Sequence, residues 1–164
     1  MDFAKRFTGR ANDYAKYRPS YPQELFRFLK EKCGLKTGDV VADVGAGTGI
    51  FTAGLLDTGF EVFAVEPNDD MRAQAEKSFG NNPAFHAVKG SAEDTKIEKE
   101  SVSLVTAAQS FHWFCVEKFA QECSRILKPL GEVALVWNNR DYTSCLEQEY
   151  QELCRQYCPE YRGP

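Results

Sequence analysis

Sequence features typical of membrane and secreted proteins are missing from this chain. No apolar run in its 164 residues is long enough to cross a lipid bilayer. The opening residues 1–6 lack the apolar core of a signal peptide. We therefore expect a cytoplasmic protein that does not associate with membranes.

A local metal-binding pattern is also absent. None of the six cysteines forms a Cys-x-x-Cys pair, the spacing typical of zinc and redox sites. The two histidines, His86 and His112, lie too far apart in sequence to form a local ligand pair. We expect reduced, mostly buried thiols and no metal site.

Excess positive charge is lacking overall but present at the N-terminus. The net charge of −4 disfavours nucleic acid as a partner, because phosphate neutralisation supplies most of that affinity. Residues 1–36 carry nine Lys or Arg against four Asp or Glu, whereas the remainder carries eleven against twenty. The basic segment is either a solvated face or a surface that attracts an anionic substrate or a carboxylate.

Strand and helix patterns alternate along the chain, without repeats or low-complexity segments. This alternation predicts an α/β fold, a Rossmann-like doubly wound sheet of about five parallel strands. Strands are predicted at 40–44, 61–66, 84–88, 102–107 and 132–137. Helices are predicted from Pro22 to just before Gly34, through 51–56, and at 71–79, 116–127 and 145–157.

A glycine-rich turn follows the first predicted strand. Asp43 ends that strand, and Gly45, Gly47 and Gly49 come next at every second position. Glycines let the backbone bend sharply close to a ligand, and the following helix presents free N–H groups there. The dinucleotide fingerprint would need a third glycine where Ile50 stands, which disfavours a nicotinamide-dependent oxidoreductase. A carboxylate before the loop opposes a pyrophosphate and suits an ammonium group, so we expect a cationic nucleoside ligand.

Glu66 ends the second predicted strand, 21 residues after Gly45. A carboxylate at this place can accept two hydrogen bonds from ribose hydroxyls. Considered without the glycine loop, Glu66 would be interpreted as a solvated glutamate at the end of a strand. The glycine loop at the expected distance favours ribose binding.

Several segments together resemble the class I S-adenosylmethionine-dependent methyltransferases. Residues 41–49 resemble motif I, residues 65–71 the post-I segment, and residues 90–94 the loop that flanks adenine. Residues 14–22 and 109–114 resemble the methyltransferase type 11 subgroup, which includes trans-aconitate methyltransferase-like proteins. The resemblance runs from about Tyr14 to about Trp137.

The resemblance implies a S-adenosyl-L-methionine site. Its implied residues are Asp43, Gly45, Ala46, Gly47, Gly49, Glu66, Pro67, Asn68, Met71, Ala92, Glu93 and Gln109. Asp43 would lie at the methionine part, Glu66 at the ribose, and Ala92 and Glu93 at the adenine. Met71 has the alternative of simply packing on its helix. Ser91 stands where the subgroup often has Asp.

The N-terminal aromatic residues have two interpretations. Tyr14, Tyr17, Arg18 and Tyr21 either form a lid or pack as a surface turn. In a lid, aromatic faces suit a sulfonium cation and Arg18 suits a carboxylate.

Two residues after the fourth predicted strand are candidates for the substrate side of the site. His112 is either a general base or a ring that packs beside Trp113. We divide the chain into a lid and first helix (1–36), the cofactor-binding core (37–140) and a C-terminal helix that starts a substrate region (141–164).

The expected function is methyl transfer to a small molecule, with a carboxylate or hydroxyl acceptor. The alternative is a cofactor-binding module without catalysis. Nucleic-acid methylation is disfavoured, because no Asn/Asp-Pro-Pro-Tyr/Phe tetrapeptide occurs. The resemblance also implies an antiparallel strand pair after the fifth strand, which we do not find. The fifth strand would then be a free edge that either marks a fragment or pairs with a second copy in a homodimer.

Overall fold

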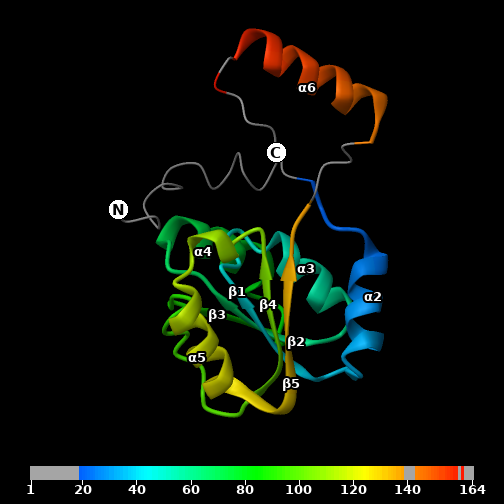
Figure 1. Cartoon of the computed structure of the whole chain (residues 1–164). Helices are drawn as coiled ribbons and strands as arrows, with labels where there is room; N and C mark the ends of the chain where they lie inside the picture. The colour runs from blue at the N-terminus through cyan, green and yellow to red at the C-terminus, as the bar shows by residue number, and fades with distance from the viewer. Residues whose placement is uncertain (1–18, 139–142, 159, 161–164) are drawn as a thin grey trace.

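One parallel β-sheet forms the centre of the protein (Figure 1). The computed structural model describes residues 19–138, 143–158 and 160. The five strands are β1 (Val40–Val44), β2 (Glu61–Val65), β3 (Phe85–Val88), β4 (Val102–Ala108) and β5 (Leu127–Val136). They lie in the order β3-β2-β1-β4-β5, and all neighbouring pairs are parallel. The predicted α/β fold with five parallel strands is confirmed.

Helices pack on both faces of this sheet. The helices of the described residues are α2 (Gln23–Lys32), α3 (Ile50–Asp57), α4 (Asp69–Phe79), α5 (Val116–Ile126) and α6 (Cys145–Tyr157), with a short 3-10 helix, η2 (Phe111–Trp113). Val62 of β2 belongs to the apolar cluster of α2 and α3, whereas Val65 belongs to the cluster of α5. Successive strand residues therefore serve opposite layers, as strands buried on both faces require. Helix α6 lies apart from the sheet (Figure 1).

The strand order places a crevice beside β1. From β1 the chain builds β2 and β3 on one side, then crosses over to build β4 and β5 on the other. In doubly wound sheets, ligands bind at the carboxyl ends of the strands where the order reverses. The carboxyl ends of β1, β2 and β4 are therefore where a ligand site is expected.

The start of β5 differs from the prediction. Helix α5 ends at Ile126, and the strand begins at Leu127 rather than at Glu132. Val102 pairs with Leu127 and Leu104 with Glu132, so residues 128–131 bulge out of the ladder. Proline cannot continue a helix or donate to a ladder, and Pro129 lies within this bulge.

The outer edge of β5 pairs with no strand among the described residues. No antiparallel strand follows it in that part of the chain. Val133, Leu135 and Trp137 are each more than two-fifths exposed along it. Pairing of this edge in a homodimer stays a prediction. None of the described helices has the length and apolar character needed to cross a membrane.

Candidate functional site

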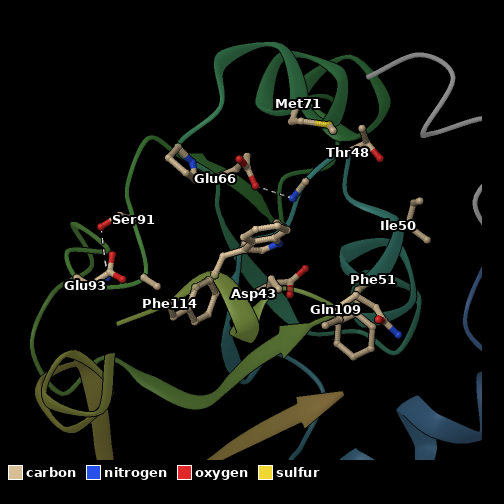
Figure 2. A pocket seen from close by; sticks show the side chains of 18 of the residues that line it. Asp43, Thr48, Ile50, Phe51, Glu66, Met71, Ser91, Glu93, Gln109 and Phe114 are labelled. Carbon is tan, nitrogen blue, oxygen red and sulfur yellow. Dashed lines mark hydrogen bonds between the residues drawn. The ribbon is translucent and has the colours of Figure 1, made fainter. Parts of the chain in front are cut away.

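A cavity of about 380 Å³ opens at the carboxyl ends of β1, β2 and β4 (Figure 2). Most of its walls come from the glycine loop after β1 with the start of α3, the end of β2, the loop after β3, and the chain around and after the end of β4. Tyr21, before α2, and Met71 of α4 also line it. Pockets of this size hold small-molecule ligands. The cavity lies where the reversal of strand order predicts a site.

Asp43 lies at the base of the cavity and is only 1% exposed. The Thr52 hydroxyl donates to Oδ2 at 2.6 Å, and the Thr106 hydroxyl donates to Oδ1 at 3.0 Å. Burial raises the pKa of Asp43 to about 6, although the two hydroxyl donors oppose the shift. Because burial disfavours its charged form, Asp43 would be stabilised by a cation bound in the cavity.

Two glycines of the loop are required for different reasons. Gly45 has φ +72°, and an added Cβ would lie 2.6 Å from Cβ of Ser110. Gly47 has φ +59°, and an added Cβ would meet nothing within 4 Å. Both line the cavity. Gly45 therefore lets the loop pack against the end of β4, and Gly47 leaves space that a ligand can occupy.

Glu66 is mostly buried and holds the glycine loop in place. The backbone amide of Gly47 donates to Oε2 and that of Asn68 donates to Oε1, each at 2.9 Å. Burial raises the pKa of Glu66, and these amides oppose the shift. A carboxylate oxygen accepts more than one hydrogen bond, so each oxygen keeps capacity for a ligand hydroxyl.

The far wall joins two loops. Ala92 and Glu93 line the cavity from the loop after β3. Oε1 of Glu93 accepts a hydrogen bond of 2.9 Å from the backbone amide of Cys115, at the start of α5. The Glu93 side chain is thus already used in part by the protein.

Most predicted site residues gather around this cavity. Those that line it are Tyr21, Asp43, Gly45, Ala46, Gly47, Glu66, Pro67, Met71, Ala92, Glu93, Gln109 and Trp113. Gly49, Asn68 and His112 are not among its lining residues. Tyr14, Tyr17 and Arg18 lie outside the described residues.

The three predicted residues that do not line the cavity have other structural roles or contacts. Gly49 caps α3 with φ +85°, and an added Cβ would lie 2.7 Å from the Phe79 ring. Asn68 caps α4 by accepting a 3.0 Å hydrogen bond from the Met71 amide. His112 is exposed, and its ring centroid lies 4.6 Å from that of Trp113. The packing alternative therefore describes His112 in this structure, and its catalytic role stays a prediction.

Some lining residues were not selected as binding residues from the sequence. They are Thr48, Ile50, Phe51, Ser91, Ala108, Ser110 and Phe114. Thr48 lies between two motif glycines and is 4% exposed. Its hydroxyl has no hydrogen-bond partner within the described residues. Its position between two glycines of the motif could have indicated from the sequence that Thr48 lines the site.

The comparisons with known proteins agree with this geometry. A family model described as a methyltransferase domain matches residues 42–135. The chain belongs to this methyltransferase family. An uncharacterized methyltransferase-like protein of Schizosaccharomyces pombe is 36% identical over 140 residues, which cover 85% of this chain and 54% of that protein.

Solved structures share the fold. A protein of Anaeromyxobacter dehalogenans assigned as a type II methyltransferase is 31% identical, with a TM-score of 0.70 over 85% of this chain and 59% of that one. A phosphoethanolamine N-methyltransferase of Haemonchus contortus, solved with S-adenosyl-L-methionine, has a TM-score of 0.70 over 95% of this chain and 40% of its own. At 22% identity, that likeness shows the fold alone. The methyltransferase spans little more than half of the curated relatives it matches.

The family's cofactor, S-adenosylmethionine, fits the residues present. The cavity combines two buried carboxylates, Asp43 and Glu66, with the open space at Gly47. The unpartnered hydroxyl of Thr48 adds a further hydrogen-bonding group within the same loop. A ligand with cationic groups and ribose hydroxyls matches this set. Membership of the trans-aconitate-like subgroup stays a prediction.

Proposed function

We propose that this methyltransferase binds S-adenosylmethionine in the described cavity and transfers its methyl group to a small neutral acceptor. One observation carries the proposal. Asp43 and Glu66 lie at the carboxyl ends of the adjacent parallel strands β1 and β2, line the same cavity, and flank a glycine loop that Glu66 itself holds. A diphosphate would be repelled by this pair, whereas a cationic nucleoside is attracted.

Each group of lining residues has a role in this proposal. Asp43 binds the ammonium of the methionine part, and Glu66 binds the ribose hydroxyls. Ala92 and Glu93 border the adenine from the loop after β3. Support comes from their shared cavity and from the charge of the two carboxylates.

The protein's contribution to transfer is mainly orientation. When bound, the cofactor supplies a methyl carbon made electrophilic by its sulfonium. The aromatic side chains of Phe51, Trp113 and Phe114 line the cavity, and apolar walls of this kind limit the access of water to bound reactants. Holding two reactants in line can lower a barrier by about 7–11 kcal/mol. No metal-binding cluster occurs in the described part of the chain.

The charge of the cavity favours a hydroxyl acceptor over a carboxylate acceptor. Three acidic side chains, Asp43, Glu66 and Glu93, line it, and none of its described lining residues is Lys, Arg or His. The carboxylate of an acidic acceptor would be repelled by these side chains. The expectation of a carboxylate acceptor depended on the basic N-terminal segment and on Arg18, and residues 1–18 lie outside the described residues.

Binding is tested first by calorimetric titration with S-adenosylmethionine, S-adenosylhomocysteine and NAD. We expect binding of the first two and none of NAD. Asp43→Asn should weaken both ligands, whereas Asp39→Asn, which alters a carboxylate outside the cavity before the same strand, should not. Binding of NAD alone would contradict the proposal.

Turnover is tested with labelled methyl donor and matched alcohols and carboxylic acids of the same carbon skeleton. We expect label on the alcohols. Label on the acids alone would overturn the neutral-acceptor proposal. Cofactor binding without label on any acceptor would favour the alternative, a cofactor-binding module without catalysis.

A further inference from the structure

The connection between β3 and β4 is long and irregular. Residues 89–101 contain no helix or strand apart from the isolated bridge between Ser91 and Asp94. Lys96 and Glu100 have φ of 62° and 52°, which is costly for residues other than glycine. Such a segment keeps one shape only when surrounding contacts impose it.

Helix α5 supplies a buried anchor for this connection. Glu122 of α5 is 8% exposed. Its Oε1 accepts hydrogen bonds from the Thr95 amide at 2.8 Å and from the Thr95 hydroxyl at 2.6 Å. Arg125 donates to both oxygens of the carboxylate, at 2.8 and 2.7 Å. All four hydrogen bonds end on one charged group, and charge-assisted bonds are the stronger kind.

The anchored residue is close in sequence to the cavity wall. Thr95 is 1% exposed and follows directly after the Ser91–Asp94 bridge. Within that bridge, Ala92 and Glu93 line the cavity. A shift of Thr95 would therefore move the wall that Ala92 and Glu93 form.

The connection is tied to α5 along the length of the helix. At the start of α5, the Glu93 carboxylate accepts a hydrogen bond from the Cys115 amide. Near the end of the helix, the Glu100 amide donates to the Arg125 carbonyl at 3.0 Å, and the Ser101 amide donates to the Ile126 carbonyl at 2.9 Å. Glu122 provides the side-chain anchor between these two ends.

We propose that Glu122 is a positioning residue for the adenosine end of the cofactor site, because it holds Thr95 and the adjoining cavity wall against α5. The inference rests on the proposed function, in which that wall borders the adenine. Glu122 does not line the cavity. It acts on the ligand only through the connection.

The test compares two ligands by calorimetry on the 164-residue chain. S-adenosylhomocysteine carries the whole nucleoside and amino acid, whereas 5′-methylthioadenosine lacks the amino acid. Glu122→Ala should weaken both by the same factor, about tenfold, since a buried anchor is lost. Glu122→Gln keeps an oxygen for Thr95 and should restore most of the affinity. Thr95→Val keeps the amide and removes the hydroxyl, so it should weaken both ligands by less than Glu122→Ala.

A control separates positioning from general destabilisation. Leu29→Ala removes a buried side chain of α2, in a different apolar cluster from α5. It should lower the melting temperature while leaving both affinities unchanged. Should Glu122→Ala not fold, Thr95→Val carries the test, because it too should weaken both ligands.

Three results would count against the inference. Unchanged affinities in Glu122→Ala and Thr95→Val, or in Thr95→Val where Glu122→Ala does not fold, would overturn it. So would a loss confined to S-adenosylhomocysteine, which would place the effect at the methionine end. If the unaltered chain binds neither ligand, the proposed function fails first, and this inference fails with it.

Discussion

The backbone amide of Gly47 donates a 2.9 Å hydrogen bond to the carboxylate of Glu66. This bond joins the loop after β1 to the end of the neighbouring strand β2. The Asn68 amide uses the other carboxylate oxygen at the same distance. Glu66 thus fixes the glycine loop from within the protein, independently of any ligand, which is how a binding site is preorganised.

Replacing Glu66 by glutamine should therefore cost both stability and affinity. Each oxygen of Glu66 accepts a backbone amide, and in Glu66→Gln one of them is replaced by an NH2 group that cannot accept. We expect the free energy of unfolding in urea to fall by about 1–3 kcal/mol. Affinity for S-adenosylhomocysteine in calorimetry should fall at least tenfold.

Glu61→Gln provides the matched control in the same strand. Its carboxylate lies 2.8 Å from Nε2 of His86, but the Glu61 side chain is 41% exposed. Exposed ion pairs contribute little, so both quantities should stay near those of the unaltered chain. Equal behaviour of the Glu66 and Glu61 variants would refute a special role for Glu66.

The central strands and the glycine loop could be predicted because their signals are local. Three of the five residues of β1 are valine, a residue that favours strands. The glycines Gly45 and Gly47, close after Asp43, favour a sharp turn. Glu66 could be placed because parallel strands bring their carboxyl ends together. The cap role of Asn68 was not predicted, because Asn68 was assigned to the cofactor site and the helix was expected to start at residue 71, although asparagine before an acidic first turn is typical of a helix start.

Contacts that join distant segments could not be predicted. The bulge at residues 128–131 depends on how β5 pairs with β4. The hydrogen bond from Cys115 to Glu93 spans 22 residues, and the anchor from Thr95 to Glu122 spans 27. No periodicity or motif encodes such pairs, because they arise only when the layers pack.

Alanine at the two loop glycines should separate folding from binding. In Gly45→Ala, the new methyl would clash with Ser110, so we expect a loss of several kcal/mol of unfolding free energy, about 2–4. In Gly47→Ala, the methyl enters open space, so only the positive φ is penalised, by about 1–2 kcal/mol. Urea denaturation measures both.

Ligand titration completes this comparison. Gly47→Ala should stay folded yet bind S-adenosylhomocysteine at least tenfold more weakly, because its methyl occupies ligand space. An unaffected affinity in this variant would show that the ligand does not approach Gly47. Equal losses of stability in the two variants would contradict the packing described for Gly45.

Ligand affinity should depend on pH through Asp43. Burial raises its pKa to about 6 from the ordinary 3.8, so the carboxyl is largely protonated at pH 5 and ionised at pH 7. The ionised form attracts the ammonium of S-adenosylhomocysteine, so affinity should rise between these values. 5′-Methylthioadenosine has no ammonium, and its affinity should change much less.

The stability of the unliganded protein should change in the opposite direction. An acid whose folded pKa is raised binds more protons when folded, so its stabilising contribution is full below pH 3.8 and is lost as pH rises through about 6. Asp43→Asn cannot titrate and should remove both pH dependences. Their persistence in Asp43→Asn would assign them to another group, of which Glu66, with its raised pKa, is the first to examine.

Replacing His112 should have little effect on turnover. The imidazole is exposed, is not among the lining residues, and packs beside Trp113. His112→Ala should therefore change kcat less than about threefold, since a general base typically contributes 10²–10⁴-fold. Trp113→Ala removes a cavity wall and should raise KM for the acceptor. A hundredfold loss of kcat in His112→Ala with KM unchanged would instead make His112 the base, and would require the imidazole to turn into the cavity when both substrates are bound.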